Sequence, residues 1–378
     1  MASPATLDYG YFVDSDSECD VESEAEPRER YGEGLYYPTQ IGEILSCRYC
    51  IEHKLDQEVA LKIMIAGEGQ TECQIQGEMH KALQDPSQFV LYQDVFYLAG
   101  AGGTQHMVFV YPLRGPNLRD TFSETPVALR MSAAKQLLLA VKSMHDAGFV
   151  HKDLNLGNVM WDIKSIDGWP TAEIYRIFGR PRKTLLHEAK GKPGELVEPL
   201  RIPTTMIGTP VYLGDFGLSF RHGDAVEATI QFPLPFCAPE RLHSAVPSFT
   251  TDMWSYMVIF LTLYLGFNPI TGNGTMCVSR VIGMLGPFPE HWKSSYTGGD
   301  AIVDWWWDHS GKVALPELPL ETLRAKIARR RPDVSERERD HVLDLLRRGL
   351  CYEPESRITA AQLLVDPSFT ALMAIYGL

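Results

Sequence analysis

The sequence predicts an α+β protein in which a small, β-rich lobe precedes a larger, α-helical lobe. Two observations support this division. Four apolar runs between residues 48 and 113 have the composition of strands: RYCIEHKL, EVALKIM, FVLYQDVFYLA and QHMVFVYPL. From about Arg114 onward, the apolar residues recur with helical spacing instead. A chain of 378 residues is long enough for two compact lobes.

The sequence predicts that residues 1–35 form an acidic, disordered tail. Their central segment, DSDSECDVESEAE at 14–26, contains few large apolar groups, and such a composition does not bury a core. We therefore expect ordered structure to begin near Tyr36.

The small lobe is predicted to cover residues 36–112. In it, the strand EVALKIM (58–64) is followed by TECQIQGEMHKALQ (71–84), whose apolar residues have helical spacing. Two further strands complete the lobe.

The larger lobe is predicted to cover residues 113–378. The segment ALRMSAAKQLLLAVKSMHDAG (128–148) has the pattern of an amphipathic helix that ends at Gly148. The run MVIFLTLYLGF (257–267) predicts a buried helix, because it is too short to span a bilayer. Residues 162–210 contain several Pro, Gly and charged residues with little periodicity, so we expect a spacer insertion there.

Composition and charge restrict the class of partner. The formal net charge of −13 argues against a nucleic-acid surface and suits a basic partner or peptide substrate. The seven cysteines are scattered, and the pair Cys47 and Cys50 has no second pair to complete a zinc site. This pattern indicates a reducing compartment, the cytoplasm or the nucleus. We expect a monomer that binds neither nucleic acid nor membranes.

Two motifs carry the residues that predict the chemistry. HKDLNLGN contains Asp153 and Asn158, and a loop of this length can place one carboxylate beside a substrate hydroxyl while the amide oxygen reaches Mg²⁺. Asp215, followed by Phe216 and Gly217, can supply a second oxygen ligand to this hard cation.

The strand and helix of the small lobe supply the remaining parts. Lys62, in VALK, can pair with phosphate oxygens, and Glu78 on the following helix can hold Lys62 in place through an ion pair. Together with Asp153, Asn158 and Asp215, these residues form the set used in phosphoryl transfer, where catalysis is mostly positioning and charge neutralisation. The expected cofactors are ATP and Mg²⁺.

The order of these motifs, with CAPE at 237–240 after them, resembles the eukaryotic protein kinase superfamily from about Tyr36 to the C terminus. More narrowly, the chain is similar to fungal relatives of the SR-protein kinases, in the segments YPLRGPNLRD, GRP (179–181), MLGPFPEHWK and YEPESRITAAQLLVDPSF. A small-molecule kinase is disfavoured, because CAPE and DMWSYM (252–257) are typical of protein kinases.

The resemblance implies a two-lobed serine/threonine kinase, a role for each residue, and a protein substrate that is basic or Arg/Ser-rich. Asp153 would be the catalytic base, with Lys62 and Glu78 paired over the phosphates and Asn158 and Asp215 on Mg²⁺. The remaining implied roles are the adenine sandwich of Ala60 and Met160, the gatekeeper Tyr111, the hinge Pro112, Leu113 and Arg114, the bracing pair Glu240 and Arg357, and the loop anchor Asp252.

The sequence departs from this family at several positions. Only Asp56 and Gln57 separate the first two strands, and no glycine occurs between residues 43 and 61, so the glycine-rich loop and part of the first hairpin are missing. Either the loss is real, which favours a pseudokinase that only binds, or the sequence is a truncated form of an active kinase.

Three smaller departures lie near the motifs. Asn155 replaces the Lys usual in the family, and Lys152 replaces the Arg that grips a phosphorylated activation loop. Leu234 occupies a position where related kinases carry Arg. Control by activation-loop phosphorylation is therefore not expected, and recognition of Arg/Ser-rich substrates is open.

Overall fold

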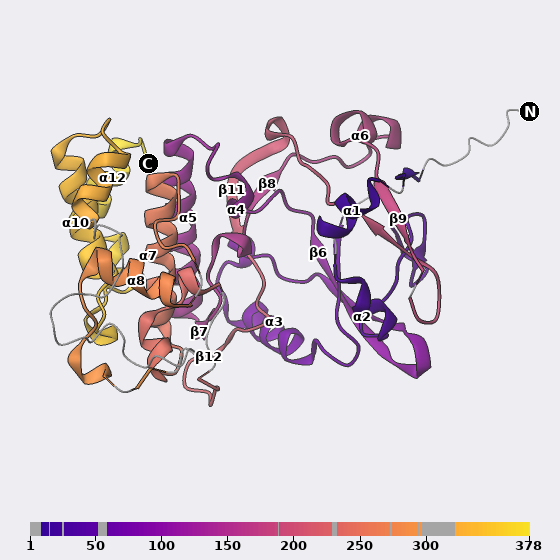
Figure 1. Ribbon diagram of the computed structural model, residues 1–378, viewed down its shortest axis with the longest axis horizontal. Coiled ribbons are helices and arrows are strands. Elements are labelled where there is room, and N and C mark those ends of the chain that lie inside the picture. Colours follow the sequence, from indigo (N-terminus) through magenta and orange to yellow (C-terminus); the bar gives the residue numbers. More distant parts are fainter. Residues whose placement is uncertain are drawn as a thin grey trace, which may run out of the picture. The chain divides into compact units, whose positions relative to one another are not determined.

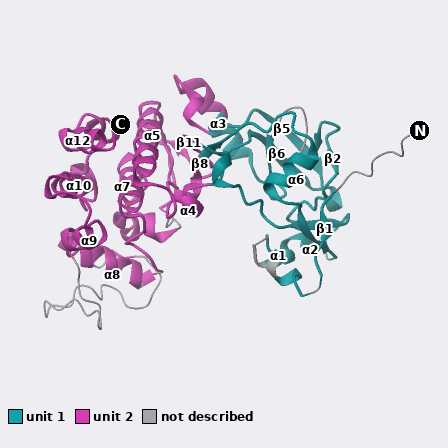
Figure 2. Ribbon diagram, turned by 90° about the horizontal axis from the view of Figure 1, so that it is seen from above, with its two compact units in different colours: residues 1–76, 90–116, 161–208 teal, residues 77–89, 117–160, 209–378 magenta. Residues whose placement is uncertain are grey.

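The computed structural model describes residues 9–14, 16–24, 26–51, 59–187, 189–228, 233–272, 274–293, 295–296 and 322–378. The chain forms two compact units (Figure 2), of which unit 1 comprises residues 1–76, 90–116 and 161–208 and unit 2 comprises 77–89, 117–160 and 209–378. Unit 1 holds the larger sheets, and unit 2 holds the long helices (Figure 1). The predicted α+β architecture with a strand-rich first part and a helical second part is confirmed.

The main sheet of unit 1 has three antiparallel strands in the order β4 (Val59–Ile63), β6 (Gln105–Pro112) and β5 (Asp94–Ala99). Alternate residues of β5 are buried, as the period of a strand with one covered face requires. The covered face packs against the hairpin of β2 (Ile44–Leu45) and β3 (Tyr49–Cys50), through the buried residues Leu45, Phe96, Leu98, Val108 and Val110. The predicted gap in the first hairpin falls on residues 52–58, which lie outside the described residues.

The N-terminal segment differs from the predicted disordered tail. It contains β1 (Tyr11–Phe12), α1 (Glu18–Glu24) and α2 (Arg28–Gly32). Strand β1 pairs in parallel with β9 (Arg182–Leu186) of the spacer, and β10 (Gly194–Val197) pairs with the other edge of β9. A small apolar core, the tail–spacer core, joins the two segments through the buried side chains of Val21, Tyr31, Leu186 and Leu196. The prediction of disorder rested on the acidic average composition of the segment, whereas its few apolar residues are the ones that are buried.

The spacer is structured as well, and it belongs to unit 1 rather than to the helical part where the sequence placed it. Besides β9 and β10, it contains α6 (Thr171–Phe178), an amphipathic helix. Ile174 and Phe178 on the apolar face of α6 are buried with Ile166 and Met206, and Leu113 packs against this cluster. The part of the spacer with α6 and the part with β9 and β10 thus each bury their own apolar residues, although neither part shows a long periodic pattern.

The core of unit 2 is α7 (Phe249–Leu265), in which every residue from Thr251 onward is buried. A helix that is apolar all round is typical of a protein interior, so the predicted buried helix is confirmed. A capping box of Ser248 and Thr251 begins α7, and Gly266 ends it with φ of 75°. Helix α5 (Val127–Asp146) lies beside α7 (Figure 1) and ends just before Gly148, as predicted.

Further helices complete unit 2: α4 (Leu118–Thr121), α8 (Gly274–Leu285), α9 (Leu323–Arg330), α10 (Glu336–Gly349), α11 (Ala360–Leu364) and α12 (Pro367–Ile375). Helix α3 (Gln70–Ala82) begins in unit 1 and ends in unit 2. Among the described residues, no single helix is long and apolar enough to cross a bilayer; residues Pro354–Leu364 and Pro367–Ile375 reach that length only as a pair bent by 50°.

Candidate active site

The loop that carries Asp153 is anchored to α7 by a buried carboxylate. Asp252 accepts hydrogen bonds from the backbone N–H groups of His151, at 2.8 Å, and Lys152, at 2.9 Å. The Nε2 atom of His145 lies 3.0 Å from the same carboxylate. Lys152 has a left-handed φ of 70°, a conformation that persists only where the surroundings fix it. The structure thus contains the anchor that the sequence resemblance implies for Asp252.

Two amide side chains hold the carboxylate of Asp153. Asn158 Nδ2 donates to Oδ2 of Asp153 at 2.9 Å, and also to its backbone carbonyl at 2.8 Å. Asn155 Nδ2 donates to the other oxygen, Oδ1, at 3.1 Å. Burial raises the pKa of Asp153, and the nearby His151 and these two hydrogen bonds only partly oppose the rise. The carboxylate is therefore both oriented and partly desolvated.

Asn155 has a structural reason to replace the usual lysine. Its Oδ1 accepts a hydrogen bond from Gly157 N at 2.8 Å, which caps the short 3₁₀ helix η3 (Leu156–Asn158). The side chain is buried, and its amide nitrogen is bonded to Asp153 at the same time. A side chain extended toward a phosphate could not make both of these contacts.

The segment with Asp215 is bonded directly to this loop. It follows strand β11 (Ile207–Leu213), and Gly214 N donates to the carbonyl of Asn158 at 2.9 Å. His151 Nε2 lies 3.1 Å from the carbonyl of Gly214. The ring of Phe216 is fully buried, with its centroid 5.3 Å from that of His151. Asp215 itself is exposed and has a left-handed φ of 57°.

The donor set of Asn158 and Asp215 fits a magnesium ion. Both N–H bonds of the Asn158 amide are used on Asp153, which leaves its carbonyl oxygen as the group available to a cation. Asp215 supplies an exposed carboxylate. Mg²⁺ is commonly bound by one or two such oxygen ligands together with phosphates. Among the described residues, no group of three or more His, Cys, Asp or Glu side chains could hold a metal by itself.

The ion pair of Lys62 is made with Glu72, not with Glu78. Lys62 Nζ lies 2.9 Å and 3.0 Å from the two carboxylate oxygens of Glu72, which is buried. Glu72 also accepts hydrogen bonds from Gln76 Nε2 and from the hydroxyl of Tyr111, both at 3.0 Å. The prediction of Glu78 was wrong, and this residue pairs with Arg221 instead, at 2.9 Å.

The spacing of the two glutamates along α3 explains the error. Six residues turn an α-helix by roughly 240°, so the two side chains leave different faces. Glu72 shares its face with Ile75, Gln76 and Met79, all of which are buried. An acid on the apolar stripe of a helix, with a glutamine four residues later, was the signal that could have identified Glu72.

The remaining predicted residues lie in three different surroundings. Ala60 of β4 pairs across the sheet with Tyr111 of β6, whose hydroxyl is bonded to Gln76 and Glu72. Leu113 packs on the core that α6 forms in unit 1. Met160 belongs to unit 2, where it lies in β8 (Val159–Ile163) and forms an isolated bridge with Asn117.

The implied bracing pair is present and buried. Arg357 donates to both carboxylate oxygens of Glu240, at 2.7 Å and 3.0 Å. Its remaining donors reach the backbone carbonyls of Thr250 and Cys351, and its guanidinium lies 5.2 Å from the ring centroid of Trp254. The pair ties the last residue of CAPE to the segment before α11, and Arg357 also contacts α7 through Thr250 and Trp254.

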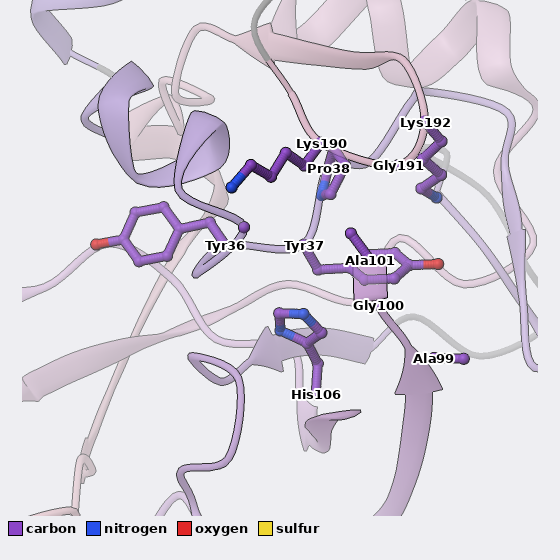
Figure 3. Close-up of a pocket in the computed structure, with 11 residues that line it drawn as sticks. Tyr36, Tyr37, Pro38, Ala99, Gly100, Ala101, His106, Lys190, Gly191 and Lys192 are labelled. Atoms are coloured by element: carbon purple, nitrogen blue, oxygen red, sulfur yellow. The ribbon is translucent and has the colours of Figure 1, made fainter. Parts of the chain in front are cut away.

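A cavity of about 230 Å³ lies elsewhere in unit 1 (Figure 3). Three segments of the chain line it, with the residues Gly34, Tyr36, Tyr37, Pro38, Ala99, Gly100, Ala101, His106, Lys190, Gly191 and Lys192. The ring of His106 meets the edge of Tyr37, and its Nδ1 lies 3.0 Å from the carbonyl of Met64. None of the predicted site residues contributes to this cavity.

Comparison with known proteins gives a consistent result. The model of the family described as "Protein kinase domain" matches residues 41–369. A serine/threonine protein kinase of Aspergillus fumigatus is 24% identical over 396 residues, which cover 93% of this chain and 91% of the relative. The dual specificity protein kinase CLK1 of Homo sapiens is 26% identical over 365 residues, 88% of this chain and 68% of the relative. The serine/threonine-protein kinase SRPK of Physarum polycephalum is 24% identical over 402 residues, 92% of this chain and 91% of the relative.

Proposed function

This chain belongs to the protein kinase family, and we propose that it transfers the γ-phosphate of ATP to a serine or threonine hydroxyl of a protein. The single observation that best supports catalysis is the state of Asp153. Its carboxylate is held by Asn155 and Asn158 on a loop that Asp252 anchors to the central helix. A positioned carboxylate of this kind orients the attacking hydroxyl and accepts its proton.

We assign the phosphate-binding charge to Lys62, which Glu72 holds in place. Asn158 and Asp215 would hold Mg²⁺, and the bound ion would neutralise charge on the phosphates. Ala60, Tyr111, Leu113 and Met160 remain the proposed surroundings of the adenine, a role for which the family resemblance is the support.

The proposed substrate is a basic or Arg/Ser-rich protein. The net charge of −13 supports this, because an acidic surface attracts a basic peptide and raises its local concentration. The seven cysteines are all free, which supports a reducing compartment such as the cytoplasm or nucleus.

One observation favours a second candidate, a pseudokinase that binds without transferring phosphate. The sequence between residues 43 and 61 contains no glycine, whereas backbone N–H groups of a glycine-rich loop normally cover the phosphates. Losing three hydrogen bonds to charged phosphates, at roughly 1.5–3 kcal/mol each, would move a micromolar ligand to millimolar or weaker.

The experiment compares three chains in transfer of radiolabelled phosphate to a basic, Ser-containing peptide. The first is the 378-residue chain, the second carries about twenty family-like residues inserted after Leu55, roughly the length of two strands and a loop, and the third is the second with Asp153→Asn. We expect transfer by the second chain and a loss on the order of 10²–10⁴ in the third. Absence of transfer by both of the first two chains would refute catalysis, and undiminished transfer by the third would exclude Asp153.

A further inference from the structure

The ion pair between Glu78 and Arg221 has no role in the site as described so far. Glu78 Oε2 lies 2.9 Å from Arg221 Nε, and the two side chains are 30% and 48% exposed. Glu78 lies in the second half of α3, and Arg221 ends strand β12 (Phe220–Arg221). Both residues belong to unit 2.

Arg221 is held from a second side as well. Strand β12 pairs with β7 (Phe149–Val150), in a register that places Arg221 opposite Phe149. The guanidinium lies 4.9 Å from the ring centroid of Phe149, within the range of a cation–π contact. Just beyond Arg221, His222 N donates to the carbonyl of Gly148 at 2.9 Å.

The short ribbon of β7 and β12 connects both parts of the site. Strand β7 runs directly into the loop with Asp153, and β12 follows the segment that begins at Asp215. With two residues in each strand, the ribbon is far shorter than a strand pair that is stable by itself. Contacts made by its side chains must therefore contribute to holding it in place.

We propose that the pair of Glu78 and Arg221 is a positioning contact for the kinase reaction. It fixes β12 against α3. Because β12 follows Asp215 and pairs with β7, which precedes Asp153, the contact keeps both of these backbone segments in their observed positions. Since partly exposed ion pairs contribute little to global stability, the effect is local order around β12. This inference rests on the proposed function, but its structural part can be measured without it.

The structural experiment measures amide hydrogen exchange at residues 220–222 in the full chain. Glu78→Gln and Arg221→Gln should each raise the exchange rate about three- to fivefold, the range expected for one partly exposed pair. In the double variant of Glu78→Gln with Arg221→Gln, exchange should be no faster than in Arg221→Gln alone, because each single variant already breaks the ion pair and only Arg221 also loses its contact with Phe149. Glu173→Gln is the matched control, because it removes another surface pair, with Arg176 at 2.5 Å, and should leave exchange at 220–222 unchanged.

The kinetic experiment uses the same variants in a chain that transfers phosphate. Each single variant should lower kcat by about the same three- to fivefold and leave KM for ATP unchanged. Added salt screens the ion pair, so it should lower the kcat of the original chain toward the kcat of the variants. Unchanged exchange in both single variants would overturn the proposal, as would raised exchange with unchanged kcat. A double variant whose exchange rate rises by the product of the two single effects would overturn it as well, because it would show that the two side chains act independently. Absence of transfer by both the 378-residue chain and the chain with the inserted residues refutes the proposed function, while the exchange result still decides whether the pair orders β12.

Discussion

Replacing Val21 with alanine tests whether the acidic N-terminal segment is part of the folded protein. Val21 is fully buried in α1, where it joins Tyr31, Leu186 and Leu196 in the tail–spacer core. The change removes two methyl groups from this core. At about 0.8 kcal/mol for each buried carbon, the transfer free energy alone is roughly 1.5 kcal/mol. A residual cavity would bring the total cost to about 2–3 kcal/mol.

The assay is thermal unfolding of the full chain, followed by circular dichroism. For a unit of this size, about 2–3 kcal/mol lowers the melting temperature by roughly 4–10 °C. Deleting residues 1–30 should lower it by at least as much, because it removes β1 and leaves Leu186 and Leu196 uncovered. The exposed Glu29, changed to alanine, is the control and should cost less than about 0.5 kcal/mol. A melting temperature within one degree of the original for Val21→Ala, or for the deletion, would show that the segment does not pack on the spacer.

Three other predictions follow from buried or partly buried charges. Glu72→Gln removes the charge that holds Lys62, so kcat should fall on the order of 10²-fold, as expected for a misplaced catalytic group, and a steady-state rate equal to that of the original chain would refute the pairing. Burial raises the pKa of Asp153, and a general base must be ionised to accept a proton. As the pH is lowered, kcat should therefore begin to fall at a pH above about 3.9, which is the pKa of a free Asp side chain. A pH–rate profile in which kcat falls only at or below that pH contradicts this prediction. Glu240→Ala leaves Arg357 buried without its carboxylate and should destabilise the chain by about 3–5 kcal/mol in urea unfolding, whereas a loss below about 1 kcal/mol would show that the backbone carbonyls suffice.

Local patterns in the sequence predicted the parts of the fold that depend on near neighbours. The helical spacing in residues 128–148 predicted α5, and the apolar run at 257–267 predicted the buried helix α7. Lys62, Asp153, Asn158 and Asp215 remain the predicted reacting groups. Pairing of β1 with β9 was not predictable, because the two strands are distant in the sequence and β1 has only two residues. Nothing in the composition of the first 35 residues indicates which partner would cover Val21.

The prediction of Glu78 as the partner of Lys62 failed for a different reason. Both are acidic residues on one predicted helix, but the apolar positions Ile75 and Met79 place only Glu72 on its covered face. The burial of Gln76 and Met79 settles that face in the structure, and Glu72 lies on it. Asn155, which appeared only as a lost positive charge, proves to be the cap of η3 and a donor to Asp153.

The parallel pairing of β1 with β9 also determines the order in which the protein can be completed during synthesis. Residues 9–36 leave the ribosome long before β9, which begins at Arg182, exists. At about 5–20 residues per second, they wait roughly ten to thirty seconds for their partner. An apolar segment would be exposed to aggregation for all of that time. In this segment Val21 and Tyr31 are spaced widely among acidic residues, and like charges of this kind oppose association between chains.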